Sequence, residues 1–234
     1  MNDYQRIFVD KINDAARNSS RAKLFDDFLT CATAALDRDE ETFAAVENKN
    51  LHCDLLAAII GACEFSIGNK VLRDKVLNVD YRVKWINDDM KPRYRDVLGE
   101  IFRKLELYDQ DAGQVFTAQP TADLMGELAL DEARVREEIA RQGFVTVVEN
   151  CCGSGALILG YLNSLLDIGV NPCRQVLVKA ADLDPRCVKM TFVQLSLYCI
   201  PAVVEQRNVV TNEIFGKPLI TPILKCRPKE GSAS

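Results

Sequence analysis

The sequence is poor in the residues from which many enzyme centres are built. His52 is the only histidine among 234 residues, which argues against catalytic triads and metal triads that depend on imidazole. The nine cysteines contain no CxxC pair, so a zinc site is not expected. No apolar run approaches the roughly 18–20 residues that a membrane-spanning helix needs. With 48% hydrophobic and 27% charged residues, the chain is typical of a soluble globular protein.

The N-terminus and the cysteines bear on the cellular compartment. The first residues, MNDYQRIFVDKIND, are polar and mixed in charge, unlike a signal peptide. Nine cysteines without an export signal favour a reducing cytoplasm over a disulfide framework. We therefore expect a cytoplasmic protein in which four cysteines are small buried apolar side chains, namely Cys151, Cys152, Cys187 and Cys199.

Positive charge is scarce at first and then concentrated. Residues 1–69 carry 7 Lys or Arg against 12 Asp or Glu, whereas residues 70–104 carry 10 against 6. The second stretch also contains Tyr81, Trp85 and Tyr94. A basic segment with interleaved aromatics is suited to follow a DNA phosphate backbone and stack on bases. The alternative is a solvated helical face whose aromatics belong to the core, and both interpretations stay open.

The first half of the chain has helical periodicity. Between residues 4 and 108, apolar residues recur at spacings of three and four. A glycine and a proline interrupt this pattern within residues 111–120, which predicts a loop or linker. We therefore expect a helical domain over 1–110, an α/β core over 111–224 and a disordered tail over 225–234.

The second half alternates strands and helices. Two helices are expected first, over 121–130 and 132–142, with Asp131 as the N-cap of the second and Gly143 as its end. Strands are then expected over 144–149, 174–184 and 202–210, and helices over 155–167 and 184–199. This β-α-β-α-β order implies a parallel sheet with right-handed crossovers. The predicted fold class is therefore α/β: a helical N-terminal half followed by a partial doubly wound, Rossmann-like sheet.

A Gly-Ser-Gly turn joins the first strand to its helix. Gly153 and Gly155 allow a sharp turn and a close approach of the backbone to a ligand. The next helix offers unpaired N–H groups and a partial positive charge. Ile158 stands where a dinucleotide fingerprint has its third glycine, which weakens an NAD interpretation. No Lys-Ser or Lys-Thr pair follows the glycines, which excludes a P-loop.

Acidic residues end the first two strands. Glu149 would repel a pyrophosphate but suits a cofactor that carries an amino or sulfonium group. Asp182, at the end of the second strand, is placed to accept hydrogen bonds from both hydroxyls of a ribose. The pattern favours S-adenosylmethionine as the ligand. The alternative is an ordinary α/β turn with a solvent-facing aspartate.

Four segments together resemble a known enzyme family. They are 149-ENCCGSGALIL-159, 114-QVFTAQPTADLM-125, 180-AADLDPRCVKMTFVQLSLYCI-200 and 206-QRNVV-210. The first resembles the D-P-A-C-G-S-G-G/A cofactor loop of adenine-N6 DNA methyltransferases, and the others resemble the family's F-T-P, ribose-binding and G-D-x-L segments. The likeness is greatest to the modification subunits of type I restriction systems, and it covers roughly residues 110–212.

The resemblance implies a set of site residues. Phe116 and Thr117 would border the cofactor, and Asp182 would bind its ribose. The loop would consist of Glu149, Cys152, Gly153 and Gly155, and Asn208 would approach the adenine. This chain departs from the family by having Glu149 and Asn208 in place of aspartates, and Asn150 and Ala118 in place of prolines.

The family's N/D-P-P-Y/F tetrapeptide is absent from the sequence. In the family it holds the amine of a flipped base and stacks an aromatic ring on it. Asn171-Pro172-Cys173-Arg174 is the nearest match, but it lies between the first two cofactor motifs. Asn212 and Phe215 are a second candidate pair, or else a turn cap and a packed ring.

Three functional interpretations therefore stay open. The chain is a DNA methyltransferase relative that is active alone or with a partner, a pseudo-methyltransferase that binds DNA or other restriction–modification subunits as a regulator, or an unrelated α/β enzyme. The partners we expect are DNA, bound through residues 70–104, and either other restriction–modification subunits or further copies of this chain. We expect no association with a membrane.

Overall fold

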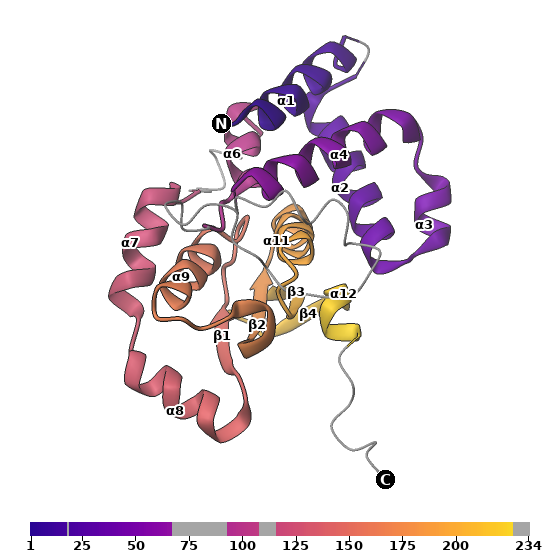
Figure 1. Cartoon of the computed structure of the whole chain (residues 1–234). Coiled ribbons are helices and arrows are strands. Elements are labelled where there is room, and N and C mark those ends of the chain that lie inside the picture. Colours follow the sequence, from indigo (N-terminus) through magenta and orange to yellow (C-terminus); the bar gives the residue numbers. More distant parts are fainter. Residues whose placement is uncertain (18, 67–92, 108–115, 227–234) are drawn as a thin grey trace.

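The computed structural model describes residues 1–17, 19–66, 93–107 and 116–226, shown in Figure 1. The N-terminal helices are α1 (Asp3–Ala15), α2 (Arg21–Asp37), α3 (Glu40–Ala45), α4 (Lys49–Ser66) and α6 (Val97–Lys104). The second half contains α7 (Gln119–Ala129), α8 (Glu132–Gln142), β1 (Val145–Glu149), α9 (Ala156–Asp167), α10 (Pro172–Gln175), β2 (Val176–Asp182), α11 (Pro185–Leu197), β3 (Ala202–Asn208), β4 (Glu213–Ile220) and α12 (Pro222–Lys225). The fold is thus α/β, with a helical N-terminal region followed by a sheet with interleaved helices.

An aromatic cluster holds the N-terminal helices together. The ring centroids of Phe8 and Phe28 lie 4.9 Å apart, and those of Phe25 and Phe102 lie 5.6 Å apart. All four rings are fully buried. The rings come from α1, α2 and α6. The apolar residues that recur at spacings of three and four on these helices therefore pack into one shared core. The predicted helical character is confirmed for the described part of residues 4–108, while residues 67–92 lie outside it.

The predicted ends of α8 are confirmed. The Asp131 side chain accepts a hydrogen bond from the backbone N–H of Arg134 at 3.1 Å, as an N-cap does. Gly143 ends the helix with a φ of 84°, in the left-handed region that glycine tolerates best. The preceding helix, α7, begins at Gln119, two residues before its predicted start, and has Pro120 in its first turn.

The sheet has four strands in the order β1-β2-β3-β4. The first three are parallel, as predicted, and β4 pairs antiparallel with β3. The antiparallel strand was not predicted. The third strand was expected to continue to residue 210, but it ends at Asn208. Instead the amide oxygen of Asn208 accepts hydrogen bonds from the N–H groups of Val210 and Thr211 and turns the chain back.

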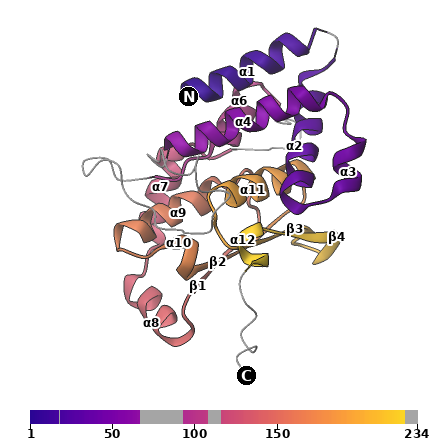
Figure 2. The same ribbon diagram turned by 45° about the vertical axis from the view of Figure 1, so that its right-hand side comes forward.

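The molecule is layered on one side of the sheet. In Figure 2, α9 and α11 lie between the strands and the helices α1 and α4. Strand order runs in one direction, so right-handed crossovers place both connecting helices on the same face. The strand order does not reverse among the described residues, so the partial doubly wound character of the sheet stays a prediction.

Two glycines bring α7 against α9. A Cβ on Gly126 would lie 2.6 Å from the carbonyl carbon of Gly160, and a Cβ on Gly160 would overlap the carbonyl oxygen of Ala122. Only glycine permits this close approach. The apolar periodicity of the two helices does not predict it. The close packing fixes α7, and with it the segment that begins at Phe116, beside the first crossover helix.

Candidate ligand-binding site

The three parallel strands end at one edge of the sheet. Glu149 ends β1, Asp182 ends β2 and Asn208 ends β3. Parallel pairing places the three side chains at the same edge, where ligands of open α/β sheets bind. The loop 150–155 follows β1 there and leads into α9.

Both glycines of the loop have left-handed backbone conformations. Gly153 has a φ of 54° and Gly155 a φ of 100°. The loop is also tied to its neighbours: the Cys152 N–H donates to the Ala181 carbonyl at 2.9 Å, and the Thr191 hydroxyl donates to the Gly153 carbonyl at 2.9 Å. These bonds connect the loop to β2 and α11, so its shape is set by the sheet and not by the turn alone.

Asp182 faces this loop. Its Oδ2 accepts a hydrogen bond from the Gly153 N–H at 2.8 Å, and its Oδ1 accepts one from the Asp184 N–H at 3.0 Å. The residue is only partly buried. Each carboxylate oxygen has a second lone pair. Asp182 is therefore oriented by two backbone groups and remains able to accept hydroxyl donors.

Phe116 lies beside the loop at Gly153. A Cβ on Gly153 would lie 3.9 Å from the Phe116 ring. That ring packs against Phe102, with centroids 5.0 Å apart. The Arg103 guanidinium donates to the Thr117 carbonyl at 3.2 Å and so holds the same segment. The structure thus brings Phe116 to the loop, and half-buried Thr117 follows it.

The remaining predicted loop residues act through different atoms. A Glu149 carboxylate oxygen accepts a hydrogen bond from the Cys151 N–H at 3.0 Å. Cys152 is buried, and burial raises the pKa of its thiol to about 12, so it is a neutral thiol whose backbone N–H and carbonyl are already hydrogen-bonded to Ala181 and Gly155.

The predicted burial of the four cysteines is only partly correct. Cys152 and Cys187 are buried and Cys199 is partly buried, but Cys151, in the turn after β1, is exposed. All nine cysteines of the sequence are free thiols.

Asn208 and the pair Asn212 and Phe215 lie beyond the loop. The Asn208 oxygen already accepts two backbone hydrogen bonds. Asn212 has a φ of 58° in the turn before β4. The Phe215 ring is 37% exposed on β4, so it is not packed in the core as the alternative interpretation had it.

Sequence reasoning missed a buried acid behind the loop. Asp96 has no exposed surface, and its Oδ2 accepts a hydrogen bond from the Ser154 hydroxyl at 2.6 Å. Burial raises the pKa of the Asp96 carboxyl, while hydrogen bonds from Ser154 and Gln194 oppose the rise. The available signal was its position before a short amphipathic helix, where an aspartate acts as an N-cap.

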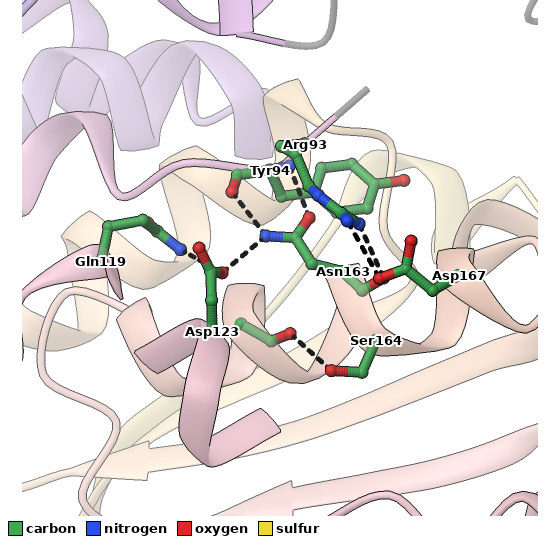
Figure 3. Close-up of polar contacts among 8 residues, drawn as sticks. Arg93, Tyr94, Gln119, Asp123, Asn163, Ser164 and Asp167 are labelled. Atoms are coloured by element: carbon green, nitrogen blue, oxygen red, sulfur yellow. Dashed lines mark hydrogen bonds and ion pairs between the residues drawn. The ribbon is translucent and has the colours of Figure 1, made fainter. Parts of the chain in front are cut away.

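A second polar cluster, shown in Figure 3, lies between α7 and α9. The Asn163 amide accepts from the Tyr94 N–H at 2.8 Å and donates to the Tyr94 carbonyl at 3.0 Å and to Asp123 at 2.9 Å. Gln119 also donates to Asp123, at 2.9 Å. Arg93 and Asp167 form an ion pair at 3.0 Å beside this cluster.

The predicted nucleic-acid segment lies mostly outside the described residues. Residues 70–92, which include Tyr81 and Trp85, lie outside the residues that the structure describes. Tyr94 is 6% exposed and packs against Tyr198, with centroids 5.1 Å apart. For Tyr94, the interpretation as a core aromatic is therefore correct.

A groove of about 350 Å³ runs along β1, which is an edge strand of the sheet. Residues of α7, α8 and α9 form its other walls, including Met125, Arg134 and Tyr161. Of the predicted site residues, Glu149 alone lines it, so the groove and the loop are separate features.

The described residues contain no group of three His, Cys, Asp or Glu side chains suited to a metal ion. No helix among them is long and apolar enough to cross a membrane.

Comparison with known proteins gives no family assignment. No protein-family model matches the chain, and neither the curated proteins nor the solved structures contain a match. The geometry of the site and the resemblance of the motifs are therefore the features that bear on function.

Proposed function

We propose that the chain binds S-adenosylmethionine at the carboxyl ends of β1 and β2. The observation that carries this proposal is the joint placement of Asp182, the Gly153 N–H and the Phe116 ring around one loop. An oriented carboxylate suits a pair of ribose hydroxyls, a glycine backbone permits close approach, and an aromatic ring covers apolar parts of a nucleoside.

The site residues then have distinct roles. Asp182 accepts hydrogen bonds from the ribose, and Glu149 attracts the amino group of the methionine part. Cys152 ties the loop to β2, Gly153 and Gly155 leave room beside the loop for the ligand, and Phe116 and Thr117 form a wall of the site. Because the Asn208 oxygen caps its own turn, its amide nitrogen is the group left to donate to a ring nitrogen of the adenine.

The reaction we propose for the cofactor is methyl transfer to the N6 atom of adenine in DNA, in a protein of the restriction–modification type. The residues that grip the flipped base in the resembling family are absent from this sequence. We therefore propose that the chain lacks a complete catalytic site by itself and depends on a partner subunit for the acceptor groups. The alternative is a regulatory pseudo-methyltransferase that binds DNA or other subunits.

The first experiment is a calorimetric titration of S-adenosylmethionine into the purified protein. We expect a micromolar or weaker Kd, raised at least about tenfold by Asp182→Ala, or about 1.4 kcal/mol. Glu137→Ala is the matched control, because it removes an exposed carboxylate on α8 without touching the loop. Equal weakening by both variants would contradict the assigned site, and absence of binding by the folded wild type would overturn the proposal.

A second measurement separates the enzyme from the regulator. Transfer of a labelled methyl group to DNA, with and without candidate modification subunits, would support the enzymatic interpretation. Cofactor binding without transfer in any combination would favour the regulatory alternative.

A further inference from the structure

Ser154, the central residue of the Gly-Ser-Gly turn, is held from inside the molecule. It is 2% exposed, and its hydroxyl donates to Asp96 at 2.6 Å. Its carbonyl accepts a hydrogen bond from the Gln194 side chain, also at 2.6 Å. Both its backbone and its side chain are therefore fixed by buried residues.

One buried carboxylate organises these contacts. Asp96 Oδ1 accepts hydrogen bonds from the Gly99 N–H at 2.8 Å and from Gln194 Nε2 at 3.0 Å. The Asp96 N–H donates to Gln119 at 2.8 Å. Asp96 thus links the loop, α6, α7 and α11, which are far apart in the sequence.

The fit around this carboxylate leaves no spare room. A Cβ on Gly99 would overlap both the Asp96 carboxylate and the Ser154 hydroxyl. An exposed aspartate would cap α6 equally well, whereas a buried carboxyl must be desolvated. Capping the helix alone does not account for this placement, because it does not require contact with Ser154.

The segment that carries Asp96 is also held at its other end. Residues 93–96, which we call the strap, are bound at Tyr94 by the Asn163 amide and at Arg93 by Asp167 (Figure 3). The strap leads directly into α6, whose Phe102 belongs to the aromatic core of the N-terminal helices. It is therefore a physical connection from those helices to the loop.

We propose that Asp96 is a positioning residue that holds the loop in its ligand-binding shape through Ser154, and that the strap thereby couples the N-terminal helices to the ligand site. This inference rests on the proposed function only for the identity of the ligand. The coupling itself requires that loosening the contact between Ser154 and Asp96 releases the Gly153 N–H from Asp182.

The test uses Ser154→Ala with a matched control, Ser164→Ala. Both serines are 2% exposed, but the Ser164 hydroxyl donates to the Gly160 carbonyl within α9 and does not contact Asp96. Hydrogen exchange of peptides spanning 150–155 is compared with that of peptides from β2 and α9. We expect at least about tenfold faster exchange of the loop amides in Ser154→Ala alone. Unchanged loop exchange, or equal acceleration throughout the molecule, would overturn the inference.

Affinity for S-adenosylmethionine supplies the second measurement. Calorimetry on Ser154→Ala, Asp96→Asn and the double variant should give a Kd raised about tenfold or more by each single change, without further loss in the double variant. Additive effects would show that Asp96 does not act through Ser154. If the wild type binds no S-adenosylmethionine but the loop exchange still responds, the proposed function fails while the positioning role stands.

Discussion

Two aspartates contact the loop, and the exposure of each carboxylate decides what it can do. Asp182 is partly exposed at the open edge, where it keeps lone pairs for a ligand. Asp96 is fully buried, and three donors already surround its carboxyl: Ser154, Gln194 and Gly99. The same residue type is thus suited to recognition in one place and to positioning in the other.

The single histidine, His52, gives a direct test of how burial changes the pKa of a side chain. His52 is 2% exposed, and burial lowers its pKa, aided by Lys23 and opposed by Asp27. We expect proton NMR to show the imidazole titrating below the ordinary value of about 6.5. The unfolded chain then takes up the proton first as pH falls, so stability is lost below pH 6.5, by at most about 1.4 kcal/mol per pH unit.

His52→Gln is the control, because it removes this titration. Its unfolding free energy should fall less steeply with decreasing pH than that of the wild type. An imidazole pKa at or above the ordinary value would contradict the burial argument.

Among the elements, the α7–α9 pair depends most on small residues. Gly126 and Gly160 let the two helices approach closely, and Asp123 and Asn163 hydrogen-bond across the same contact. Because α7 follows directly on Phe116 and Thr117, its position controls the wall of the candidate site. Helix packing and site geometry are therefore connected here.

Gly160→Ala should destabilise the protein by about 1–3 kcal/mol. Alanine is the better helix former, but its Cβ would overlap the Ala122 carbonyl oxygen and push the helices apart. Urea unfolding followed by circular dichroism measures the change. Glu127→Ala, at an exposed position of α7, should shift stability by less than about 0.5 kcal/mol. A neutral or stabilising Gly160→Ala would show that the helices separate at little cost.

At the scale of the whole molecule, the N-terminal helices and the sheet share one core. A continuous cluster of buried apolar residues extends from Phe8 to Val204. Polar contacts reinforce it: Lys189 donates to Thr30 at 2.9 Å, and the Tyr198 hydroxyl donates to the Arg95 carbonyl at 2.8 Å. A domain boundary near residue 110 stays a prediction, and the apolar core continues across it.

A shared core predicts cooperative unfolding. Denaturation followed by far-UV circular dichroism, which reports the helices, and by near-UV circular dichroism, which reports aromatic packing, should give coincident single transitions. Two separated transitions would indicate that the helical region unfolds independently of the sheet.

Features that depend on neighbouring residues were predictable from the sequence. Asp131 and Gly143 delimit α8 through local capping and backbone freedom, and the Gly-Ser-Gly turn follows β1 as expected. Parallel pairing of the first three strands followed from their alternation with helices. Since parallel strands end at one edge, the proximity of Glu149, Asp182 and Asn208 was also predictable.

Features that depend on distant residues were decided by the tertiary structure. Asp96 and Ser154 are 58 positions apart, so no local pattern shows that one binds the other. The burial of Tyr94 depends on Tyr198, and the pairing of β4 depends on the turn that Asn208 stabilises. Local chemistry specified where elements begin and end, because caps and turns involve adjacent groups. Packing specified which side chains are buried behind the loop, because burial is a property of the assembled layers.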